Sequence, residues 1–163
     1  MTRRLIVMRH AKSSWNSPAH SDHERPLNGR GRRDAPRIGA ALVERGWTPE
    51  LVLSSDAQRT RETFAGMSAV FPSAVEARYL PSFYHAGLGA AQGELPAVPD
   101  QVACLLVLGH NPGWEDLVDW LAGEDIVMKT ANAALLSLDL ESWSAALQPG
   151  KWKLEDVIRP RER

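Results

Sequence analysis

Two histidines and two arginines stand shortly after three apolar runs of the chain. Arg9 and His10 follow the first run directly, Arg59 lies a few residues beyond the second, and His110 follows the third after one glycine. Guanidinium groups bind oxyanions through paired N–H donors, and an imidazole can attack as a nucleophile. Together with backbone N–H groups at helix starts, these side chains would form a site for an anion, most naturally a phosphoryl group.

These residues form one site only if the elements that carry them end at one place. Short all-apolar runs are typical of strands that are buried on both faces of a parallel sheet. In open α/β sheets, ligands bind beyond the carboxyl ends of such strands. We therefore expect the two histidines and two arginines to meet at one sheet edge. The predicted strands are residues 5–8, 51–53, 75–79, 104–108 and 133–140.

The first predicted helix has an apolar face that runs from Ala35 to Val43 at helical spacing. Gly46 is placed to end this helix, because glycine adopts the left-handed backbone that often follows a last turn. Pro36 interrupts the pattern, since proline lacks the N–H that a helix interior uses. The helix is therefore expected either to restart near Asp34 or to kink there.

Two further helices are predicted from their start signals. The second opens with a capping-box pattern at residues 55–58 and carries an apolar stripe to Phe71. The third opens at residues 111–112, with asparagine as the cap and proline in the first turn, and Gly123 can end it. Two segments rich in proline, glycine and polar residues are predicted as loops, residues 16–28 and 81–100.

Alternating strands and helices indicate a layered α/β domain. The chain has 163 residues, which is the length of one domain, so residues 1–163 are predicted to form a single domain. Apolar residues make up 44% and charged residues 24% of the chain, and this balance excludes a disordered or low-complexity protein.

The net charge of −1 argues against a nucleic-acid partner, because proteins that neutralise a phosphate backbone are usually strongly basic. The apolar run 5–8 is too short for a signal peptide or a membrane span, so we expect a cytoplasmic protein without a membrane partner. Cys104, the single cysteine, lies within an apolar run and is expected to be a buried, unreactive side chain.

The motifs around the candidate residues resemble those of the histidine phosphatase superfamily, which includes the cofactor-dependent phosphoglycerate mutases. Residues 9–16, RHAKSSWN, are similar to its RHG signature. Ser55 to Thr63 is similar to its second arginine motif, in which an arginine lies one turn into a helix. Gly109-His110 is similar to its second histidine motif.

Within the superfamily, the chain most resembles the short SixA-type phosphohistidine phosphatases. RHAK replaces RHG, and a Glu-Arg-Pro-Leu segment leads to Gly31. The features that complete this resemblance are GHNPG at 109–113, KTA at 129–131 and RPR at 159–161.

The resemblance implies a three-layer α/β/α sandwich with a mostly parallel central sheet, like that of phosphoglycerate mutase. It also implies that His10 is a nucleophile that forms a covalent phosphohistidine. Arg9, Arg59 and His110 would hold the phosphoryl oxygens and stabilise the charge of the transition state. Neutral imidazole is available at pH 7, and flanking arginines favour that form further.

Three weaker candidates for contact with substrate are Ser13, Asn16 and Arg25, although Arg25 can equally serve to pack its loop against Pro26. The implied activity is hydrolysis of a phosphoryl group, most naturally from phosphohistidine in a protein such as a histidine-phosphorylated signalling domain. No cofactor is implied.

One feature departs from the family pattern. Many members carry a carboxylate proton donor in the loop after the third strand, but residues 81–87 read PSFYHAG and contain no acid. The general acid is therefore open among His85, His110, Asp22 and Glu24. An easily departing group such as a phosphorylated imidazole needs less protonation, which fits a phosphohistidine substrate. The segment from Tyr79 to Val102 is also too short for a large lid, which favours a side chain on a protein surface.

Other functions remain open on sequence grounds. The main enzymatic alternative is a phosphatase of small phosphorylated metabolites, and a mutase is disfavoured by the missing carboxylate. A non-catalytic module that binds phosphorylated ligands is the alternative of a different class. A metal site built from His20, His23 and His85 is weakly signalled, because an HxxH pair in a polar loop is more often solvated. No metal is expected to be required.

Overall fold

The computed structural model describes residues 1–16, 18 and 21–160. Within this range, six strands form one sheet in the order β3-β2-β4-β1-β5-β6. The first four in this order pair in parallel, and β5 is antiparallel to both of its neighbours. The strands are β1 (Thr2–Arg9), β2 (Leu51–Ser55), β3 (Glu76–Leu80), β4 (Cys104–Gly109), β5 (Ala133–Asp139) and β6 (Lys153–Ile158).

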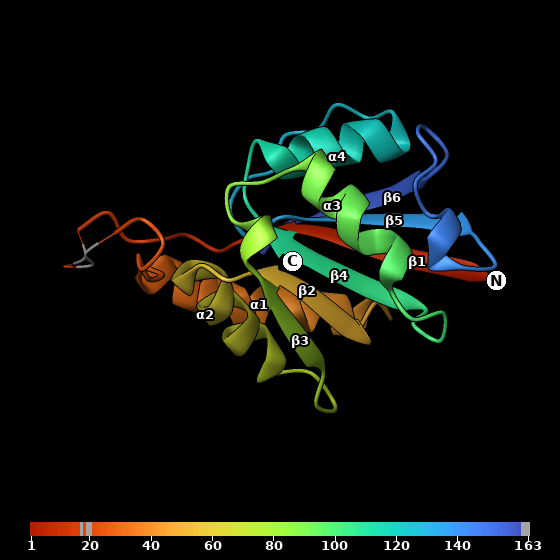
Figure 1. The fold of residues 1–163 in the computed structure, drawn as a ribbon. Helices are drawn as coiled ribbons and strands as arrows, with labels where there is room; N and C mark the ends of the chain where they lie inside the picture. The colour runs from red at the N-terminus through yellow and green to blue at the C-terminus, as the bar shows by residue number, and fades with distance from the viewer. Residues whose placement is uncertain (17, 19–20, 161–163) are drawn as a thin grey trace.

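Helices cover both faces of this sheet, which gives three α/β/α layers (Figure 1). The helices α1 (Gly29–Glu44) and α2 (Gln58–Ser68) lie on one face, and α3 (Leu88–Glu94) and α4 (Gly113–Ala122) lie on the other. Side chains of β1 alternate between the two cores: Leu5 faces the α4 side and Ile6 the α1 side. The expected fold class, with a mostly parallel central sheet, is therefore confirmed.

The helix starts differ from the expected ones. Helix α1 runs through Pro36 without restarting, and it begins where Asn28 caps it and accepts a hydrogen bond from the Gly31 N–H at 2.9 Å. The capping box expected at residues 55–58 is wrong: α2 begins at Gln58 without a side-chain cap, and the Ser55 hydroxyl accepts instead from the N–H of Ala57.

Helix α4 also begins later than expected. Asn111 does not cap it, since its side-chain amide donates to the Met128 carbonyl at 2.7 Å. Pro112 precedes the first helical residue and follows a cis peptide bond. The predicted end is confirmed, because Gly123 adopts the left-handed backbone at φ 69°.

Segment 81–100 is not a continuous loop. It contains α3 and two short 3-10 helices, Pro81–Phe83 and Leu95–Ala97, which pack into the α4-side core through Phe83, Ala91 and Leu95. Strand β6 is a further element that the sequence pattern did not indicate. Cys104 is buried as expected, and burial raises the pKa of its thiol to about 12.

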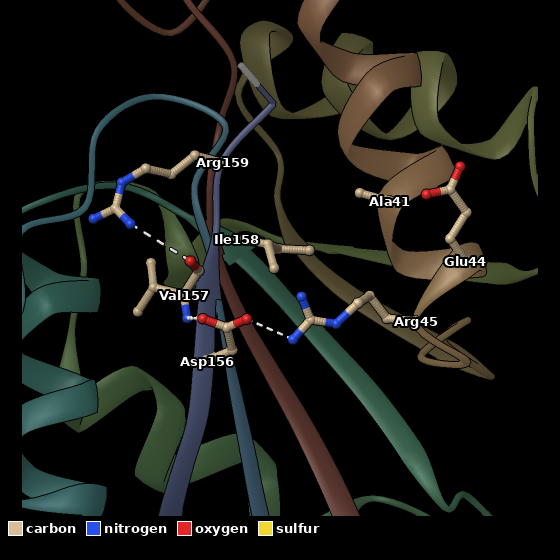
Figure 2. A pocket seen from close by; sticks show the side chains of 7 residues that line it. All are labelled: Ala41, Glu44, Arg45, Asp156, Val157, Ile158 and Arg159. Atoms are coloured by element: carbon tan, nitrogen blue, oxygen red, sulfur yellow. Dashed lines mark hydrogen bonds and ion pairs between the residues drawn. The ribbon is translucent and has the colours of Figure 1, made fainter. Parts of the chain in front are cut away.

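Strand β6 lies at the edge of the sheet, and a cavity of about 380 Å³ separates it from the end of α1 (Figure 2). Arg45 at the end of α1 forms an ion pair with Asp156 of β6 across this cavity. The other oxygen of the Asp156 carboxylate accepts from the N–H of Val157 at 2.8 Å, and Arg159 donates to the Val157 carbonyl at 3.5 Å. Within the described part of the chain, no helix is long and apolar enough to cross a membrane.

Candidate active site

The carboxyl ends of three parallel strands bring four predicted residues together. Arg9 ends β1 and His10 follows it, His110 follows β4, and Arg59 lies in the first turn of α2 after β2. The imidazole rings of His10 and His110 have centroids 5.3 Å apart. His10, His110 and Arg59 are 6%, 3% and 2% exposed, so this cluster lies largely beneath the surface.

The environment of His10 determines which nitrogen can attack. Its Nδ1 lies 2.7 Å from the carbonyl oxygen of Ala11, and a carbonyl can only accept. Nδ1 therefore carries the proton, and Nε2 of the neutral ring keeps its lone pair. Burial lowers the pKa of His10 to about 3, with further lowering by the charges of Arg59, Arg9 and Arg25, against the raising effect of the Ala11 hydrogen bond.

His110 is held in the opposite tautomer. Its Nδ1 lies 3.4 Å from Nη2 of Arg59, which can only donate, so Nδ1 accepts. Its Nε2 then donates to the Ser55 hydroxyl at 2.8 Å. Burial lowers the pKa of His110 to about 2, with added repulsion from His10 and Arg59. The ring is therefore neutral and fixes the orientation of the Arg59 guanidinium.

Arg59 already holds a carboxylate. Its Nη1 donates to the main-chain oxygen of Asp22 at 2.8 Å, and its Nη2 donates to the Asp22 carboxylate at 3.1 Å. The same carboxylate accepts from Arg25, from the Tyr84 hydroxyl at 2.7 Å and from His85 Nε2 at 2.9 Å. Burial alone would raise the pKa of Asp22, but the hydrogen bonds from Tyr84, Arg25 and His85 outweigh it and hold that pKa well below its ordinary range.

Two of the three weaker candidates, Ser13 and Arg25, adjoin this cluster. Arg25 donates to the Ser13 hydroxyl through Nη1, and its guanidinium carbon lies 3.7 Å from the ring centroid of Trp15. Both Ser13 and Arg25 are buried, whereas Trp15 is exposed. Asn16 is exposed, and its backbone N–H donates to Ser14 at 3.3 Å, so the structure does not bring its side chain to the cluster.

The charged side chains of the cluster favour the binding of a phosphoryl group. Three guanidinium groups, from Arg9, Arg25 and Arg59, act on His10; Asp22 pairs with two of them, Arg25 and Arg59, and the charge of Glu115 acts on Arg9. The guanidinium groups outnumber these carboxylates, so the cluster favours a negatively charged phosphoryl group. The Nε donors of Arg9 and Arg59 are buried and have no partner among the described residues, so they can bind oxyanion oxygens.

The loop after β3 completes the cluster. The ring centroid of His85 lies 4.2 Å from that of Tyr84 and 5.4 Å from that of His110. Backbone contact fixes this loop on α4, since a Cβ added to Gly113 would lie 2.0 Å from the carbonyl oxygen of Ala86. Only glycine fits at that position.

The weakly signalled metal site is not assembled in the described residues. His23 contacts Asp56 at 2.9 Å while His85 contacts Asp22, and His20 lies outside the described residues. No group of three or more potential ligands that could hold a metal ion occurs in the part of the chain that the structure describes.

Two members of the cluster were missed by sequence reasoning, Ser55 and Tyr84. Ser55 ends β2 and was interpreted as a helix cap, although its position at a strand end was the signal that could have placed it in the site. Tyr84 follows β3, whose carboxyl end lies at the same sheet edge. The loop after that strand therefore carried a similar signal.

Comparisons with known proteins agree with this geometry. The model of the histidine phosphatase superfamily (branch 1) matches residues 5–120. A protein of Arabidopsis thaliana, described as uncharacterized and chloroplastic, is 41% identical and covers 98% of this chain and 79% of its own length. The solved structure of a protein named phosphohistidine phosphatase SixA, from Nakamurella multipartitia, aligns with a TM-score of 0.85 and 28% identity over 99% of this chain and 98% of its own. A protein histidine phosphatase SixA complexed with tungstate aligns with a TM-score of 0.83 and 25% identity over 98% of both chains.

Proposed function

Because the chain belongs to branch 1 of the histidine phosphatase superfamily, we propose that it is a phosphatase that acts through a covalent phosphohistidine on His10. The single observation that carries this proposal is the tautomer of His10. Its Nδ1 is bonded to the Ala11 carbonyl, so Nε2 presents a lone pair in a cluster of three arginines. A nucleophile beside oxyanion-binding groups is what phosphoryl transfer requires.

The reaction proceeds in two displacements. In the first, the lone pair of His10 Nε2 forms a bond to phosphorus, and the bond from phosphorus to the leaving group breaks with its electron pair on that group. In the second, water attacks the phosphohistidine, the bond between phosphorus and Nε2 breaks, and inorganic phosphate leaves with neutral His10 restored. A separate base is not needed to generate the nucleophile, because the low pKa of about 3 keeps the imidazole neutral.

Arg9 and Arg59 are proposed to hold the equatorial oxygens of the transferring group. They stabilise the transition state by charge and need little rearrangement, since Arg59 is already fixed by Asp22 and His110. His110, whose ring centroid lies 5.3 Å from that of His10, is proposed to complete the clamp by orienting Arg59. Arg25 is proposed as a further contact to the substrate, joined to the site through Ser13 and Asp22; for Asn16, the remaining candidate, no supporting contact is described.

We further propose that the substrate is phosphohistidine on a protein. The names of the SixA neighbours support this class, as does the packing of the segment after β3. That segment contributes Ala91 and Leu95 to the core against α4, so it does not form a lid that would enclose a small metabolite. Small phosphorylated metabolites are the competing substrate class, and a non-catalytic module for phosphorylated ligands is the competing function.

The experiment that tests this proposal is a turnover panel with a trapped intermediate. Protein phosphohistidine is compared with phosphoserine, phosphotyrosine and sugar phosphates, and the enzyme is quenched in a single turnover with a radiolabelled donor. We expect turnover to be fastest with phosphohistidine, and we expect label that is lost in acid and survives base. In His10→Ala both turnover and label should disappear. Label that appears in His10→Ala at the wild-type rate would show that another group is the nucleophile.

A further inference from the structure

His85 occupies the solvent side of the active-site cluster. Its side chain is 55% exposed, while its ring lies over the buried His110 at a centroid distance of 5.4 Å. Its Nε2 lies 2.9 Å from the Asp22 carboxylate, which is ionised and can only accept. Nε2 therefore donates to Asp22, and Nδ1 is the nitrogen that can gain and lose a second proton.

Its backbone is also unusual. His85 has φ 49°, in the left-handed region that residues other than glycine rarely adopt. Such a conformation persists where surrounding structure imposes it, often at active sites. Here the imposed geometry comes from the neighbouring contact of Ala86 and Gly87 with Gly113 at the start of α4. In this conformation the His85 ring contacts Asp22 and lies beside His110.

The other groups that could protonate a leaving group are unsuited to it. Asp22 accepts four sets of donors, which keeps it ionised. Glu24 is exposed and accepts from Ser21 at 3.0 Å, and no contact between described residues joins it to the cluster. His110 is neutral, with one nitrogen donating to a hydroxyl and the other accepting from a guanidinium.

Tyr84 is the remaining group. Its hydroxyl donates to Asp22, and burial, then the hydrogen bond and charge of Asp22, raise its pKa, which makes it a weaker acid. By position and by chemistry, the exposed imidazole is therefore the group best placed to deliver a proton to an atom that leaves from the phosphoryl group on His10.

We propose that His85 is the catalytic proton donor to the leaving group and that Asp22 orients it, an inference that rests on the proposed function. As the bond from phosphorus to the leaving nitrogen or oxygen breaks, that atom takes its electron pair and accepts the Nδ1 proton of His85. In the second displacement, neutral His85 takes a proton from the attacking water. The imidazolium is thereby restored, and the carboxylate of Asp22 stabilises it.

The test varies the leaving group. Wild type and His85→Gln receive phosphoryl groups from radiolabelled phosphoimidazole, phenyl phosphate and 2,4-dinitrophenyl phosphate in single turnovers, and labelling of His10 is timed. With phenyl phosphate, a poor leaving group, we expect labelling to slow by about 10²–10⁴-fold in the variant. With 2,4-dinitrophenyl phosphate, which departs without protonation, we expect a loss below about tenfold, because little general-acid catalysis is required.

His23→Gln is the matched control. His23 lies on the same loop as Asp22 and its ring contacts Tyr84, yet its own partner is Asp56. We expect this variant to label from all three donors at the wild-type rates. Equal slowing of His85→Gln with every donor would assign His85 a binding or packing role and overturn the inference, and so would no slowing at all. Failure of wild type to take label from any donor would instead overturn the proposed function.

Discussion

Lowering the pH from 7 to 5 should destabilise the folded protein through His10. The pKa of this imidazole is about 3 in the fold, because of burial and three nearby arginines, against about 6.5 in an unfolded chain. At pH values between these two pKa values, His10 binds a proton in the unfolded state but not in the folded state. Stability therefore falls as the pH decreases through 6.5 and continues to fall toward 3.

The size of the effect follows from the two pKa values. At pH 5 an ordinary histidine is about 97% protonated, whereas His10 in the fold is about 1% protonated. The linked loss of folding free energy between pH 7 and pH 5 is about 2 kcal/mol for this one group. This loss is a sizeable part of the roughly 5–15 kcal/mol that stabilises a typical domain.

The assay is urea unfolding followed by tryptophan fluorescence at pH 8, 7 and 5, for wild type and His10→Gln. The variant lacks the titrating group, so its stability should fall by about 2 kcal/mol less than that of wild type between pH 7 and 5. Between pH 8 and 7 the difference between the two proteins should stay nearly constant. If both proteins lose the same stability between pH 7 and 5, the pKa of His10 is not depressed, and the tautomer argument loses its electrostatic support.

Three further outcomes are expected. Arg59→Ala should lower kcat by about 10²–10³-fold in a steady-state assay. Arg59→Lys should restore kcat only in part, because an ammonium lacks the planar fork of a guanidinium. Arg61→Ala, which changes an exposed arginine two residues further along the same helix, should retain wild-type turnover in that assay. Dialysis against a chelator should leave turnover unchanged, and a loss that one divalent ion reverses would contradict this. Gly113→Ala should lower the free energy of unfolding by about 1–3 kcal/mol through overpacking against Ala86. Gly93→Ala, with open space around the added Cβ, should instead raise the free energy of unfolding by up to about 1 kcal/mol. Equal effects of the two substitutions in urea unfolding would contradict the predicted clash.

The sequence was sufficient to predict the centre of the sheet. Strands β1, β2 and β4 are buried on both faces, so each contains a continuous apolar run, which is typical of a central parallel strand. Strand β6 lacks such a run, because an edge strand is half solvated and its sequence, KLEDVI, mixes charges with apolar residues. Helix α3 buries only Ala91 within its own span, so its apolar stripe is too small to recognise.

The site likewise has a part that the sequence predicts and a part that it does not, and the two differ in how their residues are positioned. His10 and His110 follow strands directly and Arg59 lies in the first helical turn after one, so parallel pairing places all three at one edge. Asp22 and Tyr84 arrive there through loops, and their mutual hydrogen bond of 2.7 Å depends on how two distant loops pack. No local pattern encodes such a contact. The predicted helix caps at Ser55 and Asn111 were wrong for a related reason. The Ser55 hydroxyl bonds to His110 and the Asn111 amide to the Met128 carbonyl, and both partners are distant in the sequence.

The sheet has an edge at β6, and this edge affects whether molecules associate at high protein concentration. An edge strand normally offers unpaired backbone donors and acceptors to any other strand that approaches, which promotes aggregation. At Val157 the N–H already donates to Asp156, and the carbonyl already accepts from Arg159. A second molecule would have to break these bonds, and the ion pair between Asp156 and Arg45, before it could extend the sheet. At this part of the edge, contacts within the chain therefore oppose self-association.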